Sequence, residues 1–211
     1  MKKGKQILVL LHRALLCLLA GAFLWGWIFT FLTDAAPEKK ITLYADLRKG
    51  SWKEMAVALE KEAPAGIRFV QVRPFSYALM NSDGLRSADL YVMSASAVAE
   101  YGEWLSPVPE ALAEAYPELT VRLPDAGAAE DTAGAEEPLS GILIFQAATG
   151  EGAAKTCLPY ADERPGEDWF LCFGRESLHT GKSDEAALIL AEKILRMPGR
   201  KKGRKNHADD F

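Results

Sequence analysis

Five residues lie at or just beyond the predicted carboxyl ends of strands, the place where α/β proteins bind their ligands. They are Asp46, Ser51, Trp52, Ser94 and Ser96. A carboxylate and hydroxyl groups there can hydrogen-bond a polar solute, and an indole ring can stack on a sugar. Helices predicted after Asp46 and Ser94 would add free backbone N–H groups and the positive end of a helix dipole. The chemistry indicated is binding, and Asp46 is the strongest single candidate for a ligand contact.

Simpler structural roles compete with this interpretation. Ser51 and Ser96 each fit the N-cap of a helix, because a serine hydroxyl accepts a bond from a free backbone N–H. Trp52 is in helical phase with Met55 and Leu59, which is the pattern of a side chain packed in the core. Both interpretations stay open on the sequence alone.

Motifs for catalysis are absent from the sequence. It contains neither G-x-S-x-G nor H-E-x-x-H. The stretch HTGKS, residues 179–183, imitates the end of a phosphate-binding loop, but Glu176 stands where that loop requires its first glycine. The neighbouring carboxylates Glu130 and Asp131 fall in a predicted loop, with no pocket to tune their acidity. We therefore expect no enzyme, no cofactor and no metal site.

The elements that position the candidate residues alternate between strand and helix. Strands are predicted at 41–47, 67–73 and 88–94. The first is followed by a helix that starts with a capping box, Ser51 and Glu54. This alternation is typical of a parallel sheet. We expect an α/β fold with a small mixed, mainly parallel sheet flanked by helices.

The second half of the chain is less regular. A short helix is predicted at 109–116, and residues 124–138 read as a flexible acidic loop. A strand after Leu139 leads through a Thr-Gly turn into a weaker strand. A further strand at 168–174 precedes a last helix that ends before Pro198.

The amino-terminal region predicts a membrane anchor. Residues 14–32 carry no charge and would form a helix about 28 Å long, close to the thickness of the hydrocarbon core. The basic segment 1–13 precedes it, so the positive-inside rule places the amino terminus in the cytoplasm. A cleaved signal peptide is the alternative, although the apolar run is long for one. We expect a single-pass protein of the cell membrane, with a linker at 33–40 and an extracytoplasmic domain at 41–197.

The charge is unevenly distributed. Residues 1–13 carry +4 and residues 199–211 carry +3, so the total of −4 leaves −11 for the chain between them. An acidic body is a poor partner for nucleic acid, which needs a basic face. The basic tail, 198–211, fits either a disordered, solubilising end or a contact with anionic lipid headgroups.

Two cysteines, Cys157 and Cys172, lie in the predicted extracytoplasmic domain. An oxidising compartment permits a disulfide between them. Their spacing fits a bridge from a loop to the following strand, but two cysteines do not establish a bond, and the pairing stays open.

The order of parts resembles the bacterial extracellular solute-binding proteins of the periplasmic-binding, type 2 fold. Three stretches carry the resemblance: ITLYADLRKGSWKEMAVALEKEAPAGIRFVQV at 41–72, SADLYVMSAS at 87–96, and EDWFLCFGRESLHTGKSDEAALILAEKIL at 167–195. Members of that family have two lobes and about twice this length, and they close on a ligand between the lobes. Because this chain has only about half that length, the resemblance implies that it is a single lobe, anchored to the membrane, and that the second lobe is missing.

Two functions are compatible with these features. The resemblance implies a non-catalytic module for a small polar solute, such as a sugar, associated with a membrane transporter or a sensor. The alternative is a protein-interaction domain. In that case the face that lines the ligand cleft in the two-lobed family has lost solute binding and docks another protein. A polar concave pocket would favour the solute. An exposed apolar patch would favour docking.

Overall fold

The computed structural model describes residues 2–33, 36–78, 82–123, 138–181 and 185–197. The chain divides into two compact units, residues 1–36 and residues 37–211. The predicted acidic loop at 124–138 lies outside the described residues except for Pro138, and the predicted basic tail at 198–211 lies wholly outside them.

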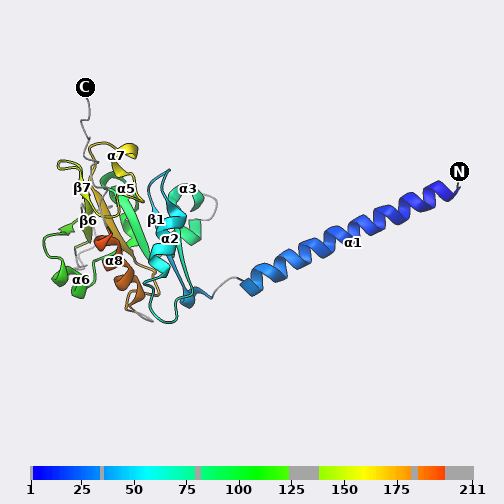
Figure 1. Cartoon of the computed structure of the whole chain (residues 1–211), viewed down its shortest axis with the longest axis horizontal. Helices are drawn as coiled ribbons and strands as arrows, with labels where there is room; N and C mark the ends of the chain where they lie inside the picture. Colours follow the sequence, from blue (N-terminus) through cyan, green and yellow to red (C-terminus); the bar gives the residue numbers. More distant parts are fainter. Residues whose placement is uncertain (1, 34–35, 79–81, 124–137, 182–184, 198–211) are drawn as a thin grey trace, which may run out of the picture. The chain divides into compact units, whose positions relative to one another are not determined.

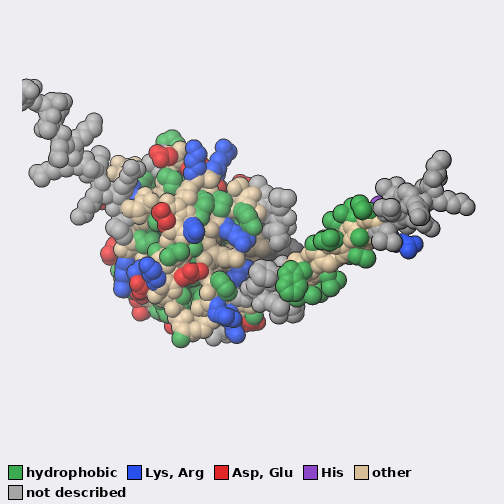
Figure 2. Space-filling view, turned by 45° about the vertical axis from the view of Figure 1, so that its right-hand side comes forward, with side chains coloured by type: hydrophobic (Ala, Val, Ile, Leu, Met, Phe, Trp, Pro, Cys, Tyr) green, Lys and Arg blue, Asp and Glu red, His purple; other side chains and the backbone are tan. Residues whose placement is uncertain are grey.

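The first unit is one helix, α1 (Lys2–Thr33). Its segment Leu11–Ile28 has a mean hydropathy of 1.5 over 18 residues and is not buried by any other part of the described structure. Apolar side chains cover the described length of this helix in Figure 2. The helix is therefore long and apolar enough to cross a membrane, although a signal sequence has the same properties.

The second unit is an α/β domain with a single mixed sheet. Its strands are β1 (Lys40–Ala45), β2 (Phe69–Pro74), β3 (Leu90–Ser94), β4 (Leu105–Ser106), β5 (Thr120–Arg122), β6 (Ser140–Gln146), β7 (Glu151–Gly152) and β8 (Trp169–Gly174). The main path through the sheet is β2-β1-β3-β8-β6-β5, with β4 paired to β8 and β7 paired to β6. A short 3-10 turn, η1 (Pro37–Lys39), leads into β1.

The helices are mostly short. They are α2 (Trp52–Glu60), α3 (Phe75–Ala78), α4 (Ser82–Arg86), α5 (Ala95–Tyr101), α6 (Glu110–Ala115), α7 (Tyr160–Glu163) and α8 (Ala186–Arg196), with a second 3-10 turn, η2 (Gly102–Trp104). Each predicted strand and helix of the first half has a counterpart in the structure within a few residues of its predicted ends.

The prediction of a mainly parallel sheet is wrong. Strand β1 runs parallel to both β2 and β3, but the other pairings among the described strands are antiparallel. Parallel neighbours are usually joined by a helix that crosses the face of the sheet. The described connection between β6 and β8 contains no such helix, only the hairpin strand β7 and the four-residue helix α7, and the two strands pair antiparallel.

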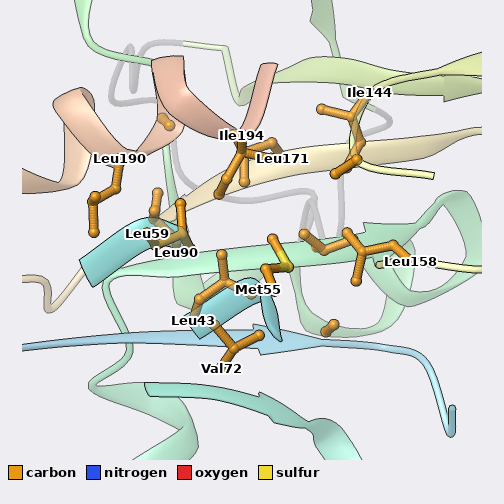
Figure 3. Close-up of a cluster of buried hydrophobic side chains, with 14 of the residues drawn as sticks. Leu43, Met55, Leu59, Val72, Leu90, Ile144, Leu158, Leu171, Leu190 and Ile194 are labelled. Carbon is orange, nitrogen blue, oxygen red and sulfur yellow. The ribbon is translucent and has the colours of Figure 1, made fainter. Parts of the chain in front are cut away.

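The two faces of the sheet bury separate apolar clusters. Helices α2, α6 and α8 cover the first cluster, to which Met55, Leu112 and Leu190 belong; Figure 3 shows much of it. Helices α4 and α5 cover the second cluster with Leu85 and Val98. Strand β8 alternates between the two clusters along its length and is buried throughout. The domain is thus a sheet between two helical layers, as Figure 1 shows.

Candidate functional site

The ends of β1 and β3 bring three of the predicted residues together. The two strands run side by side and parallel, with Ala45 opposite Val92, and the Asp46 N–H donates to the Val92 carbonyl at 2.8 Å. The Ser94 hydroxyl donates to Asp46 Oδ2 at 2.9 Å and lies 3.2 Å from the Ser96 hydroxyl. The convergence of these side chains agrees with the sequence argument. Their role as ligand contacts stays a prediction.

The sequence argument missed the residue that links them, Arg164. Its Nη2 lies 3.0 Å from Oδ2 and 3.2 Å from Oδ1 of Asp46. Its Nη1 donates to the Ser94 hydroxyl at 2.9 Å and to the Ser96 hydroxyl. The guanidinium of the chain itself therefore binds the groups that the sequence assigned to a solute.

Glu167 completes this polar cluster. One of its carboxylate oxygens accepts from the Ser96 hydroxyl at 2.8 Å and from the Ser96 N–H at 3.2 Å, and it lies 4.0 Å from Arg164 Nη1. Arg164 and Glu167 lie between α7 and β8. Because Trp169, the first residue of β8, pairs with Ser94, the last residue of β3, the residues just before β8 lie beside the end of β3. A signal existed in the sequence, since Arg164 and Glu167 precede a predicted strand, but nothing there shows that this strand inserts beside β3.

The surroundings of the cluster shift the pKa values of two carboxyl groups, those of Asp46 and Glu167. Burial raises the pKa of Asp46 above its ordinary value, although the hydrogen bond from Ser94 and the charge of Arg164 oppose that rise. Burial would also raise the pKa of Glu167, but the hydrogen bonds from Ser96 and the charge of Arg164 outweigh it and lower that pKa. Arg164 and Ser94 thus favour the ionised form of Asp46, against the effect of its burial.

Capping differs from the prediction at both serines. Ser51 occupies the N-cap position of α2, but its side chain forms no capping bond, so the predicted capping box with Glu54 is wrong. The backbone there (φ −84°, ψ 60°) is not the extended form that a capping hydroxyl needs. At α5 the cap is Ser94, whose hydroxyl accepts from the Ala97 N–H at 3.3 Å, because β3 continues directly into the helix. Ser96 therefore lies inside the helix.

Ser51 and Trp52 lie apart from the polar cluster. The Ser51 N–H donates to the Cys157 carbonyl at 2.9 Å, which ties the start of α2 to a loop. Trp52 packs against the first apolar cluster. Its ring lies over Gly50, where an added Cβ would come within 2.7 Å of the ring. The core interpretation of Trp52 agrees with this packing.

A pocket of about 480 Å³ opens beside the Asp46–Arg164 pair. We call it the aromatic pocket and define it by its lining residues, which are Asp46, Leu47, Arg48, Phe75, Ser76, Leu85, Glu100, Tyr101, Trp104, Glu163 and Arg164. Three aromatic side chains form one wall: Phe75 meets Tyr101 edge-on with ring centres 6.0 Å apart, and Tyr101 stacks on Trp104 at 4.6 Å. This size and mixture of apolar and polar groups is typical of sites for small molecules.

A second polar cluster, at the opposite end of β3, has a structural role. The buried Asp89 carboxylate accepts from the Thr42 N–H at 2.9 Å and from the Ser177 hydroxyl at 2.7 Å. The buried His179 ring lies within 3.3 Å of the Pro37 carbonyl through Nε2. These bonds join the first residues of the domain to the turn after β8. His179, the first residue of the stretch 179–183, is thus tied into the fold, while residues 182 and 183 lie outside the described residues.

The two cysteines of the domain are free thiols in the structure. Cys172 belongs to the second apolar cluster and Cys157 packs against the first, so they lie on opposite faces of the sheet. The disulfide that the sequence left open is absent. Burial raises the pKa of the Cys172 thiol. Among the described residues, no group of three or more His, Cys, Asp or Glu side chains is arranged to hold a metal ion.

Comparisons with known proteins found no similarity: no family model, no curated protein and no solved structure matches this chain.

Proposed function

We propose that this chain is a membrane-anchored, non-catalytic binding protein for a small polar solute, and that its domain faces the outside of the cell membrane. The aromatic pocket is the observation that carries the proposal. It lies beyond the carboxyl ends of β1 and β2, where Asp46 and Phe75 line it and where open α/β sheets bind ligands, and it combines aromatic rings with charged groups. The apolar segment of α1, Leu11–Ile28, and the basic residues at the start of that helix support the anchor and its orientation.

The distribution of exposed apolar side chains favours a solute over a docked protein. Within the described part of the domain, the large apolar side chains that are exposed lie on four different elements and one turn: Val57 on α2, Phe69 on β2, Tyr77 on α3, Ile189 on α8 and Leu178 in the turn after β8. A docking surface needs a contiguous apolar patch. A single lobe that presents its solute to a membrane transporter or sensor fits this surface and the resemblance stated above.

The experiment is a thermal-unfolding screen of the full chain in a polyoxyethylene detergent, which has no sugar or ammonium headgroup. Sugars, amino acids, peptides, amines and anions are added in turn. A ligand at about a hundred times its dissociation constant adds roughly 2.7 kcal/mol, a shift of several degrees for a chain of this size.

The matched variants are Ser76→Trp, which fills the pocket from an exposed lining position, and Ala115→Trp, an exposed site on α6 outside the pocket. We expect one chemical class to raise the midpoint in the wild type and in Ala115→Trp, but not in Ser76→Trp. If no class shifts the wild type, or if Ser76→Trp responds like the wild type, the proposal fails.

A further inference from the structure

The geometry points to an organic cation as the ligand of the aromatic pocket: a small compound that places an ammonium group against the Phe75–Tyr101–Trp104 wall, beside Glu100. This inference rests on the proposed function and adds the chemical class of the solute. Three features of the pocket support the inference: its aromatic rings, the charges of its lining, and the bonds that Arg164 already makes within the protein.

The lining of the pocket contains three aromatic rings, and the π face of an aromatic ring attracts a cation. Phe75, Tyr101 and Trp104 all line the pocket, and they contact one another in series at 6.0 Å and 4.6 Å between ring centres. The Trp104 indole N–H donates to Glu103 at 3.0 Å, which fixes the orientation of that ring. A desolvated cation over such faces is attracted by the quadrupoles of the rings, most strongly for tryptophan.

The neighbouring surface already contains one such contact. The Arg73 guanidinium lies 4.3 Å from the centre of the Tyr77 ring. Tyr77 is two residues beyond Phe75 on the same short helix, α3. A cation on an aromatic ring is therefore a stable arrangement at this edge of the domain.

The charges of the lining leave the pocket negative. Asp46 and Arg164 neutralise each other at 3.0 Å. Glu100 and Glu163 then face a single further cation in the lining, Arg48. The acidic body of the chain adds a long-range field of the same sign.

Glu100 stands at the aromatic wall itself. Glu100 is the main reason why the pKa of Tyr101 is raised, so its carboxylate lies near the Tyr101 hydroxyl. An ammonium group against the Tyr101 face thus has a carboxylate within reach. Glu163 is more constrained, because it accepts from the Lys49 N–H at 3.0 Å.

An anionic ligand fits this pocket less well. Two guanidiniums line the pocket and offer paired donors to a carboxylate or phosphate, the exposed Arg48 and the less exposed Arg164. Arg164 lies deeper among the polar side chains of the site. Both of its terminal nitrogens already bond within the protein, to Asp46, Ser94 and Ser96. An anion would have to compete with Asp46 for them, whereas a cation leaves this cluster intact.

The test is isothermal titration of the full chain in polyoxyethylene detergent with two probes of the same shape. Choline carries a quaternary ammonium, and dimethylbutanol is its uncharged carbon isostere. Acetate and glucose represent the anionic and neutral polar classes, and sodium chloride keeps the ionic strength equal. We expect choline to bind and dimethylbutanol, acetate and glucose to bind more weakly or not at all.

Two charge variants at the pocket give opposite results if the ligand is a cation. Glu100→Gln removes an attractive charge, and we expect choline to bind about three- to tenfold more weakly. Arg48→Gln removes a repulsive charge, and we expect binding to strengthen by about the same factor. Glu114→Gln, an exposed position on α6 outside the pocket, should leave the affinity unchanged.

The outcomes separate this inference from the proposed function. Equal binding of choline and dimethylbutanol, or weaker binding of choline in Arg48→Gln, overturns the cation assignment. Binding of acetate or glucose that Ser76→Trp abolishes, without choline binding, also overturns it but leaves the proposed function in place. If none of the probes binds and no compound class shifts the midpoint, both proposals fail.

Discussion

Replacing Arg164 with methionine removes the guanidinium that pairs with Asp46 and bonds the Ser94 and Ser96 hydroxyls. Methionine keeps much of the side-chain volume and removes the charge. The Asp46 side chain is 15% exposed and that of Arg164 is 37% exposed, so the variant leaves a mostly buried carboxylate without its cation. Breaking a fully buried pair costs about 3–5 kcal/mol. With solvent screening at Arg164, we expect a loss of about 1–2 kcal/mol in the free energy of unfolding, or about 2–8 °C in the melting midpoint.

The loss should depend on pH in a defined direction. Burial already raises the pKa of Asp46 in the folded protein, and removal of the Arg164 charge raises that pKa further. A carboxyl group whose pKa is raised on folding binds its proton more readily when folded, so its contribution to stability falls as the pH rises through the folded pKa. The deficit of Arg164→Met relative to the wild type is therefore largest at neutral pH. It shrinks as the pH falls toward the ordinary range of aspartate.

The assay is urea unfolding of the full chain in detergent, at neutral pH and at a pH near the ordinary aspartate pKa. The matched control is Arg86→Met, which breaks the Arg86–Glu103 pair at 3.2 Å, where the side chains are 52% and 67% exposed. We expect that control to cost about 0–1 kcal/mol. The reasoning is refuted if Arg164→Met costs no more than the control, or if its deficit does not shrink in acid.

Three further predictions concern the body of the domain. Gly174→Ala should severely reduce the yield of folded protein, because its Cβ would lie 1.9 Å from the Ala88 carbonyl oxygen; a midpoint near that of the wild type would contradict this packing. Asp89→Asn should lower the free energy of unfolding by about 1–3 kcal/mol, since it unbalances a buried hydrogen-bond cluster, and urea titration would show no change if that cluster were dispensable. In the folded chain, a thiol reagent should label the partly exposed Cys157 faster than the buried Cys172, and equal rates measured by mass spectrometry would count against the burial of Cys172.

Local patterns predicted which side chains meet at the ends of β1 and β3. Strand–helix alternation placed β1 and β3 in parallel, and parallel strands present their carboxyl ends at one edge. This rule alone was enough to expect Asp46, Ser94 and Ser96 near one another. Helical phase likewise indicated that Trp52 packs in the core.

The part of the site that these patterns missed, Arg164, depends on a contact between distant parts of the chain. Arg164 is 118 residues from Asp46, and it reaches the site because β8 inserts antiparallel beside β3. Strand order cannot be read from periodicity, and a buried strand such as β8 has the same apolar pattern in either direction. The predicted capping bond of Ser51 also failed because of a distant contact. The Ser51 N–H bonds to the Cys157 carbonyl, and the backbone at Ser51 does not have the extended form that a capping hydroxyl needs.

The position of Trp104 allows a direct test of the central claim, that the aromatic pocket binds a small solute. Trp104 lines the pocket, while Trp52 and Trp169 belong to or pack against the first apolar cluster, on the other face of the sheet. The measurement is the tryptophan emission of the full chain during titration with choline, compared with that of Trp104→Phe. We predict a saturable change in the wild type that is lost in the variant. A change that persists in Trp104→Phe would place binding elsewhere and contradict the claim.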